Sequence, residues 1–335
     1  MSRKLLSISI LTLTYNTDPV IFKKFLKAVN NQVYPKDKIE HLIIDGGSTN
    51  GILKIAKEFD LRVFTDKSWK NKISLRQSLA LKKSKNDLVL WLPSDNILND
   101  EYFLQKLVIP FIENPEIIAS YTFHYFYNPE SSLLNRYCSL MGLSDPVVYY
   151  FDKADRRPWF ENRTKNEILK KKNYSIVQFN KNNLPTVGDN GFMINRKILL
   201  KAKINKDYFF HTDVFIDLID KGYNKFALVY NTSVEHVTGK SFKFLIKRRI
   251  EYMSRDSDKK VIKNRRYQII NFTSSKDILN LLKFVFFTLT FVEPIFVGVR
   301  GFIKKRDLAW FVHPFICFLF LIYYGKFTLA KIFNK

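Results

Sequence analysis

The stretch Trp91-Leu92-Pro93-Ser94-Asp95-Asn96 ends an apolar run that begins at Leu88. A short apolar run that stops at a carboxylate is typical of a buried strand with an acidic side chain at its carboxyl end. Open α/β sheets bind their ligands at that edge of the sheet. The stretch therefore predicts a ligand site that includes Asp95.

Two earlier segments show the same pattern. The run of residues 5–11 leads into Thr14-Tyr15-Asn16, and the run His41-Leu42-Ile43-Ile44 leads into Asp45-Gly46-Gly47-Ser48-Thr49-Asn50-Gly51. The glycines of the second segment permit a tight turn before a helix. Three predicted strands therefore end in polar turns.

Helical patterns separate the apolar runs between residues 5 and about 127. Alternation of strands with helices predicts βαβ units and a mainly parallel sheet. Residues 129–181 are less regular, and we interpret them as an insertion. The helical patterns cover residues 20–31, 52–59, 74–83 and 101–109, and regularity returns at 186–194, before helices at 196–203 and 214–221 and a strand at 226–230.

The chain is strongly basic. Its 335 residues include 55 Lys and Arg against 31 Asp and Glu, a formal charge of +24, which favours a negatively charged partner such as a nucleotide diphosphate. Neither a zinc-ligand spacing nor a nucleic-acid-binding module accompanies this charge, so we expect no nucleic-acid partner. Basic residues cluster between residues 240 and 266, shortly before an apolar tail, which favours an anionic membrane surface.

The two cysteines and the N-terminus both bear on the compartment. Cys138 and Cys317 are far apart and form no CxxC pair, which argues against a disulfide framework or a thiolate metal site and favours a reducing compartment. Met1-Ser2-Arg3-Lys4 leads straight into a strand-like run, with no small-residue cleavage site after it, unlike a signal peptide. We therefore expect the first domain in the cytoplasm.

Two apolar segments, 278–299 and 308–324, occupy the tail, and the basic loop 300–306 joins them. Each segment is near the ~20 residues that span a bilayer, but charged residues and prolines interrupt both. If both segments crossed, the basic loop would face outward, against the positive-inside tendency. Helices that lie in the interface or enter one leaflet would avoid this conflict, and the sequence leaves both arrangements open.

From about Ser7 to Ser241 these motifs resemble, in the expected order, those of the inverting family 2 glycosyltransferases. The resemblance implies an α/β architecture, the GT-A nucleotide-diphospho-sugar transferase fold, with a mainly parallel sheet flanked by helices and a C-terminal hydrophobic membrane region. We expect a GT-A domain over residues 1–240 with an irregular insertion at 128–181, basic amphipathic juxtamembrane helices over 241–277, and a hydrophobic membrane-associated helical pair over 278–335.

The resemblance also implies a set of residues that bind a nucleotide-diphosphate sugar. The turn that begins at Asp45 looks like the family's turn after the second strand, where Asp45 would accept hydrogen bonds from the base or the ribose. Arg76 occupies a position that approaches the diphosphate, and a guanidinium has the fixed donor fork that suits phosphate. The nucleotide-binding candidates are Thr14, Asn16, Asp45, Asp66, Arg76 and Ser94.

Ser94-Asp95-Asn96 looks like the family's Asp-x-Asp metal motif, with Pro93 in place of the first Asp. Asp95 can still bind a hard divalent cation, Mn²⁺ or Mg²⁺, that bridges two phosphates, while phosphate oxygens and water complete an octahedron. Asn96 could contribute a carbonyl oxygen. His236 matches a family position near the metal and the diphosphate, so Asp95 and His236 are the metal candidates.

The acceptor side of the resemblance lies in two later segments. Gly188–Ile194 resembles the acceptor-side segment, and Thr212-Asp213 replaces the family's Glu-Asp pair. Asp213 is therefore the candidate general base that deprotonates an acceptor oxygen. If the acceptor is already a phosphate, Asp213 would only position it. Candidates for contact with the acceptor or the diphosphate are Asp189, Asn190, Lys247 and Arg248.

Each candidate also has a purely structural interpretation. Asp45 with its glycines could form only a turn, and Asp95 or Asp213 could cap the helix that follows it. A lone histidine at a strand end, such as His236, is often structural. The ordered set of motifs favours a site.

The sequence thus predicts an inverting, metal-dependent glycosyltransferase at the cytoplasmic face of the cell membrane, which transfers a sugar to a lipid-linked or cell-surface glycan acceptor. Transfer to polyprenyl phosphate is an alternative. A non-catalytic, membrane-anchored protein that binds nucleotide sugars is another, because Pro93 and Thr212 replace two usual acidic residues. A basic nucleic-acid-binding protein is the third.

Overall fold

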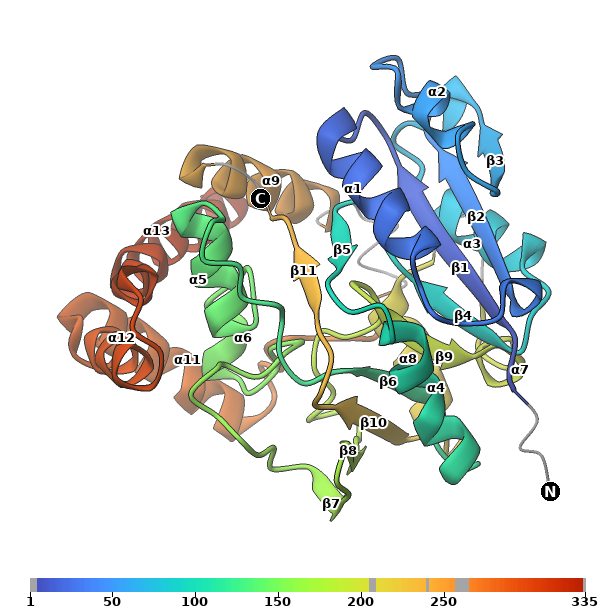
Figure 1. The fold of residues 1–335 in the computed structure, drawn as a ribbon. Helices are drawn as coiled ribbons and strands as arrows, with labels where there is room; N and C mark the ends of the chain where they lie inside the picture. The colour runs from blue at the N-terminus through green and yellow to red at the C-terminus, as the bar shows by residue number, and fades with distance from the viewer. Residues whose placement is uncertain (1–4, 205–208, 239–240, 257–264, 334–335) are drawn as a thin grey trace. The chain divides into compact units, whose positions relative to one another are not determined.

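The computed structural model describes residues 5–204, 209–238, 241–256 and 265–333. The chain divides into two compact units (Figure 1). The first unit contains residues 1–126 and 163–237, and the second contains residues 127–162 and 238–335. Residues 128–181, expected as one insertion, are therefore divided between the two units.

The first unit is built on a nine-stranded sheet with the order β3-β2-β1-β4-β9-β6-β10-β8-β7. Strands β1 to β4 pair in parallel, β9 runs antiparallel between β4 and β6, and β8 and β7 complete the sheet in antiparallel pairs. The strands are β1 (Ile8–Thr14), β2 (Ile39–Asp45), β3 (Arg62–Thr65), β4 (Leu88–Trp91), β6 (Ala119–Thr122), β7 (Glu167–Lys170), β8 (Tyr174–Gln178), β9 (Phe192–Asn195) and β10 (Lys225–Val229).

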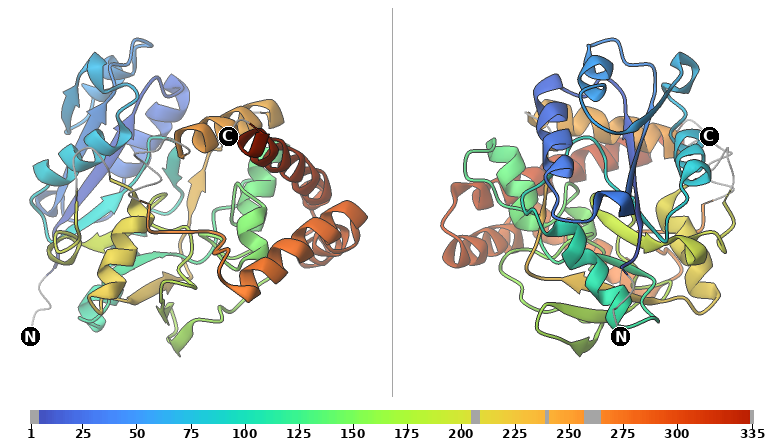
Figure 2. Two further views of the ribbon diagram at one scale, coloured as in Figure 1. Left: turned by 180° about the vertical axis from the view of Figure 1, so that it is seen from behind. Right: turned by 45° about the vertical axis from the view of Figure 1, so that its right-hand side comes forward.

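Helices cover both faces of this sheet. Figures 1 and 2 show α1 and α4 on one face and α3 and α8 on the other. Since both faces are covered, the central strand β4 is apolar throughout, and every one of its residues is buried. The helices are α1 (Pro19–Asn30), α2 (Ile52–Ala56), α3 (Ile73–Lys83), α4 (Phe103–Glu113), α7 (Arg196–Leu199) and α8 (His211–Asp220), with short 3₁₀ helices η1 (Lys36–Lys38) and η2 (Lys67–Trp69).

Local sequence explains where α1 begins. Asp18 is its N-cap, and the carboxylate accepts hydrogen bonds from the backbone N–H groups of Val20 and Ile21 at 3.0 and 3.2 Å. Pro19 occupies the first helical position, where no backbone donor is needed. Four apolar side chains of α1 then pack into the main core, namely Phe22, Phe25, Leu26 and Val29.

The register of β1, β2 and β4 places the polar turns that follow these strands at the same edge of the sheet. Thr14 pairs with Asp45 at the ends of β1 and β2, and Leu11 pairs with Trp91 at the end of β4. A separate antiparallel ribbon of β5 (Asn96–Leu98) and β11 (Val234–His236) lies beyond the end of β4. The expected α/β fold with a mainly parallel sheet is confirmed, and the three polar turns lie at one edge of it.

The second unit is helical. Its core contains Trp310, whose ring occupies the space that a Cβ at Gly301 would need. Among the polar contacts, Asp145 is the partner of Arg249 and accepts a hydrogen bond from Tyr324 at 2.6 Å. The elements are α5 (Leu133–Met141), α6 (Val147–Tyr150), α9 (Phe242–Asp256), α11 (Ser275–Thr290), α12 (Val292–Lys304), η3 (Leu308–Val312) and α13 (His313–Phe333).

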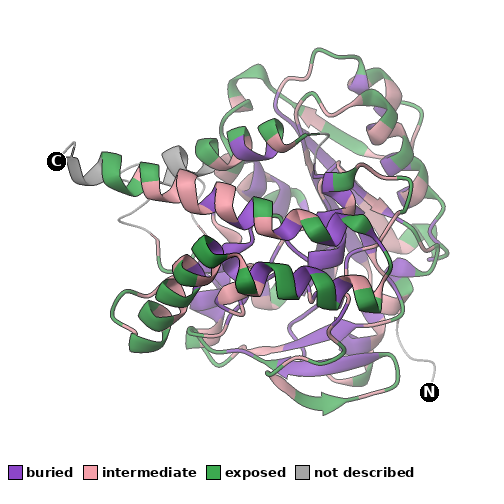
Figure 3. Ribbon diagram, turned by 90° about the vertical axis from the view of Figure 1, so that its left-hand side faces the viewer, coloured by how far each residue is buried: buried purple, intermediate pink, exposed green. Residues whose placement is uncertain are grey.

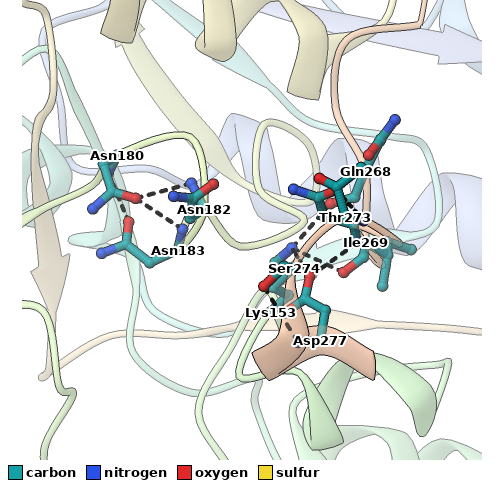
Figure 4. A network of polar contacts seen from close by, with 10 residues as sticks. Lys153, Asn180, Asn182, Asn183, Gln268, Ile269, Thr273, Ser274 and Asp277 are labelled. Carbon is teal, nitrogen blue, oxygen red and sulfur yellow. Dashed lines mark hydrogen bonds and ion pairs between the residues drawn. The ribbon is translucent and has the colours of Figure 1, made fainter. Parts of the chain in front are cut away.

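A buried lysine fixes the chain before α11 (Figure 4). Lys153 donates hydrogen bonds to the carbonyl oxygens of Gln268 and Ile269 at 2.9 and 2.8 Å. Burial lowers the pKa of the Lys153 ammonium, and the charge of Asp277 opposes this shift. Of the expected basic helices over 241–277, α9 covers the first part, residues 257–264 lie outside the described residues, and α11 begins at Ser275.

The tail contains one helix that is long and apolar enough to cross a membrane. Leu308–Ala330 spans 23 residues with a mean hydropathy of 1.7, although a third of it is buried within the protein. Residues 278–299, which read as one apolar segment, instead belong to α11 and α12, which meet at an angle of 82°. Pro294 explains the break, because proline is tolerated in the first turn of a new helix but not inside a continuous one.

His41 is buried in β2 and forms part of a chain of hydrogen bonds across three strands. The hydroxyl of Thr12 donates to the carbonyl oxygen of Leu92 at 2.8 Å, so it must accept from Nε2 of His41, 2.9 Å away. Nε2 of His41 therefore carries a proton. Burial lowers the pKa of His41 from 6.5 to about 4, which favours the neutral imidazole.

We expect the free energy of unfolding to fall as the pH drops from 6.5 to about 4, because the unfolded chain binds a proton that the folded His41 excludes. The full difference corresponds to about 3 kcal/mol. Urea denaturation of wild type and His41→Gln over this pH range measures it, since other titrating groups are common to both proteins. If the free energy of unfolding depended on pH in the same way in both proteins, His41 would not be the group responsible.

Candidate active site

Three hydroxyl groups connect the turn after β1 to the turn after β4. Thr17 Oγ1 lies 2.9 Å from Thr14 Oγ1 and 2.6 Å from Ser94 Oγ, and Ser94 donates to Thr14 at 3.3 Å. Thr14 and Ser94 are buried. The structure thus brings together two of the nucleotide-binding candidates, and Thr17, which the sequence analysis missed, bridges them.

Asn16 connects the same turn to the turn after β2. Its backbone has a φ of 48°, a left-handed conformation that asparagine tolerates better than most residues. Its side-chain oxygen accepts from the backbone N–H of Thr49 at 2.9 Å, and its own N–H donates to Ser48 Oγ at 2.8 Å. Asn16 therefore holds the two turns against each other.

Asp45 is fully buried at the end of β2. Its carboxylate accepts hydrogen bonds from the backbone N–H groups of Gly47 and Ser48 at 2.7 and 2.8 Å, from the Ser48 hydroxyl, and from Thr65 Oγ1 at 2.7 Å. These donors belong to the turn and to the end of β3. The carboxylate therefore shapes the turn that follows it.

Arg76 lies on α3, beneath the turn that Asp45 begins. Its Nη1 donates to the carbonyl oxygen of Thr14 at 2.8 Å, and Nη1 would be 3.2 Å from a Cβ at Gly46. Burial lowers the pKa of this guanidinium, and the charge of Asp45 opposes the shift. Asp66, by contrast, is exposed and caps η2 through the backbone N–H of Ser68 at 2.7 Å.

Asp95 and His236 meet at the end of the small ribbon. Asn96 pairs with His236 in the register of β5 and β11, and Val237 N donates to the carbonyl oxygen of Asp95 at 2.9 Å. Asp95 Oδ2 lies 3.8 Å from His236 Nε2, and their side chains are 27% and 13% exposed. Asp95 does not cap α4, which begins seven residues after Asn96.

A chain of amides extends from this pair. Asn96 Nδ2 donates to Asn190 Oδ1 at 3.2 Å, and Asn190 Nδ2 donates to the Tyr125 hydroxyl at 3.1 Å. The Tyr125 ring lies 5.6 Å from the His236 ring, centroid to centroid. Tyr125 was not among the sequence candidates, although its place just after a buried strand at the same edge is the signal that marks the others.

Asp213 lies in the first turn of α8 and is buried. The N-cap of α8 is Phe210, so Asp213 is not the capping residue. The segment that contains Gly188 packs against this helix, because a Cβ at Gly188 would lie 2.8 Å from His211 Cβ and 2.6 Å from Phe215 Cε2. Asp189, in the same segment, accepts from the N–H of Asn190 at 3.0 Å.

The two remaining candidates, Lys247 and Arg248, lie on α9 in the second unit. They are therefore not part of the set that the first unit gathers at the carboxyl edge of its sheet.

The residues at this edge fit a divalent cation that also binds substrate oxygens. Asp95 and His236 supply a carboxylate oxygen and an imidazole nitrogen from neighbouring strands. Asn96 Oδ1 is buried and has no hydrogen-bond partner within the described part of the chain. No group of three His, Cys, Asp or Glu side chains suited to a metal occurs among the described residues, so phosphate and water oxygens would have to complete the coordination.

Comparison with known proteins identifies the family. The sequence profile of glycosyl transferase family 2 matches residues 9–201. The chain belongs to this family. The matched range contains β1 to β4, their turns and Asp95, whereas Asp213 and His236 lie beyond it.

Several solved structures are similar to this family 2 chain, and one of them shares its fold with a TM-score above 0.5. The mannosyltransferase PcManGT from Pyrobaculum calidifontis, in complex with GDP-Man and Mn²⁺, is 12% identical, with a TM-score of 0.51 over 95% of this chain and 86% of that one. TarS from S. aureus is 14% identical, with a TM-score of 0.47 over 77% of this chain and 41% of that one. Glucosyl-3-phosphoglycerate synthase from Mycobacterium tuberculosis is 16% identical, with a TM-score of 0.47 over 77% and 78%. No curated protein sequence matches the chain.

The contacts of Asp45 predict a large effect on stability. Asp45→Ala would leave the partly buried N–H groups of Gly47 and Ser48 and the Thr65 hydroxyl without their acceptor, at a cost of about 3 kcal/mol. Urea denaturation measures the change. Asp66→Ala is the matched control, because its carboxylate is exposed and holds only a short 3₁₀ turn, and equal effects of the two substitutions would contradict the prediction.

Proposed function

We propose that this family 2 glycosyltransferase moves a sugar, with inversion, from a nucleotide-diphosphate sugar to a lipid-linked or cell-surface glycan at the cytoplasmic face of the membrane. The observation that carries the proposal is the pairing of Asp95 with His236 at the edge where the turns after β1, β2 and β4 meet. PcManGT, which shares the fold, binds GDP-Man and Mn²⁺, and this supports a nucleotide sugar and a divalent metal as ligands here.

The turns after β1 and β4 would contact the nucleotide. Thr14 and Ser94 present hydroxyl groups that can exchange their mutual hydrogen bonds for bonds to ribose oxygens. The exposed carboxylate of Asp66 can accept from donors of the base. Asp45 and Arg76 would act on the nucleotide mainly through the turns that they hold, since both side chains form hydrogen bonds with backbone groups of those turns.

Asp95 and His236 would hold Mn²⁺ or Mg²⁺ against the diphosphate. When bound, the ion would neutralise the charge that develops on the departing diphosphate. The chain's own contribution is orientation, because the β5–β11 ribbon fixes the backbone on both sides of the two ligands. The amide of Asn96, tied to Asn190 and Tyr125, limits how far this edge can move.

Asp213 would act as the general base toward an acceptor hydroxyl. It lies in the first turn of α8, where the side chain is buried beside the segment that contains Gly188. Asp189 and Asn190, next to the start of α8, would contact the acceptor. A polyprenyl phosphate acceptor would need no base, so the requirement for Asp213 separates the two acceptor classes.

Replacement of Asp95 tests the donor site. We expect Asp95→Ala to reduce release of nucleoside diphosphate from the preferred donor about 100-fold or more, because one of two protein ligands of the ion is lost. The assay uses membranes that contain the protein, UDP- and GDP-sugars, and Mn²⁺ or Mg²⁺. Asp60→Ala, an exposed carboxylate of the same unit, should behave as wild type.

Two outcomes would contradict this donor site. Full activity of the wild type in EDTA would show that the reaction needs no divalent metal. Full activity of Asp95→Ala would show that Asp95 is not a ligand of that metal. No release from any donor, with a lipid extract supplied as acceptor, would favour the non-catalytic binding protein.

Replacement of Asp213 tests the acceptor site. We expect Asp213→Asn, which preserves shape, to lower kcat at least about 100-fold while the Kd for nucleoside diphosphate stays within about twofold. Calorimetric titration and steady-state transfer measure the two quantities. Unchanged kcat would show that Asp213 is not the base and would favour a phosphate acceptor.

A further inference from the structure

The helices α11 and α12 each carry a stripe of exposed apolar side chains on the side opposite their packed faces. Figure 3 colours the exposed residues of the chain green. On α11 the stripe is formed by Ile278, Leu279, Leu282, Phe286 and Leu289, which are 41–61% exposed. At 3.6 residues per turn these five side chains lie within about 100° of arc. On α12 Val292, Ile295, Phe296, Val299 and Ile303 are 40–67% exposed and lie within a similar arc.

The opposite faces of both helices are packed. Phe284 of α11 is buried in a cluster that includes Cys317 of α13. Gly298 and Gly301 of α12 lie against Trp310 and leave no room for a side chain. Each helix therefore has two apolar sides, one that packs against the core of the second unit and one that is exposed. Exposed apolar side chains gathered on one face of a helix mark an interaction site.

Basic side chains border the two stripes. Lys283 of α11 and Arg300 and Lys304 of α12 are exposed. Two copies of the surface packed together would bring these like charges close, whereas anionic lipid headgroups would neutralise them. The charge therefore favours a membrane over a second copy of the chain.

The geometry of the pair favours entry into one leaflet. Helices of 16 and 13 residues are about 24 and 20 Å long, and each is shorter than the ~30 Å of a bilayer core. The angle of 82° between them prevents one straight crossing. The bend between α11 and α12 is fixed at Phe291, because this residue adopts a left-handed φ of 60° and its ring packs against Phe318 of α13.

We propose that α11 and α12 form a bent membrane anchor that inserts its apolar stripes into a single, anionic leaflet and leaves both ends of the pair on the same side. The membrane partner is that of the proposed function, but the anchor does not depend on transferase activity. This arrangement keeps the basic residues from Arg300 to Arg306 on the cytoplasmic side, which satisfies the positive-inside tendency.

Vesicle binding of the full-length protein tests the surface. Vesicles of phosphatidylcholine with phosphatidylglycerol should bind it more tightly than phosphatidylcholine alone. Phe286→Asp and Phe296→Asp should each lower the partition coefficient about tenfold or more, because each removes a large apolar group from the lipid. Val20→Asp, an equally exposed apolar position on α1, is the matched control and should bind as wild type.

Single cysteines test the topology, since Cys138 and Cys317 are buried. In sealed membrane vesicles, Lys304→Cys at the C-terminal end of the anchor should react with an impermeant maleimide from the same side as Lys57→Cys on the first unit. Reaction of Lys304→Cys only from the opposite side would show that the pair crosses the bilayer and would overturn the proposal.

Two further results would also overturn the anchor. Unchanged vesicle binding of both Asp variants would exclude the stripes as a lipid surface, and a loss of dimer in those variants by sedimentation would assign the stripes to a second copy. Nucleoside diphosphate release is measured in the same samples. Lost binding with retained release separates a failure of the anchor from a failure of the proposed function.

Discussion

The register between β1 and its two neighbours is the constraint on which the candidate site depends. Thr14 is level with Asp45, and Leu11 is level with Trp91, so three strands deliver their turns to one edge. The buried hydroxyl of Thr12 reinforces this register, because it connects His41 of β2 to the carbonyl oxygen of Leu92 after β4. A shift of one residue would break these bonds and turn every side chain of β1 to the other face.

The polar residues at this edge divide into those that hold turns and those that remain partly exposed. Asp45 and Arg76 are buried and are bonded to backbone and hydroxyl groups of the turns. Asp95 and His236 remain partly exposed, and Asp95 Oδ2 lies 3.8 Å from His236 Nε2. A charged group buried within the fold needs hydrogen-bond partners there, whereas a group that binds a cation must be reachable from solvent.

The second unit combines a packed core with an apolar surface that the fold itself does not use. Trp310 and Gly301 pack as closely as a protein core permits, and Lys153 fixes the segment before α11 through two backbone carbonyl groups. Such rigidity suits an anchor, since helices that hold a fixed angle present one defined surface to a lipid leaflet. The hydropathy of the tail alone does not distinguish this anchor from a pair of crossing helices.

The sequence by itself determined the alternation of strands and helices and the polar turns of the first unit, because strand and helix periodicity and turn residues act over short distances. It also marked Asp95, Asp213 and His236, whose order along the chain resembles that of the family. Only the tertiary structure decided that Asp45 is enclosed by its own turn, that Tyr125 joins Asn190 and Asn96, and that the apolar segment 278–299 bends at Phe291. These features depend on contacts between residues far apart in the chain, on burial and on the angle between helices, and no local pattern records them.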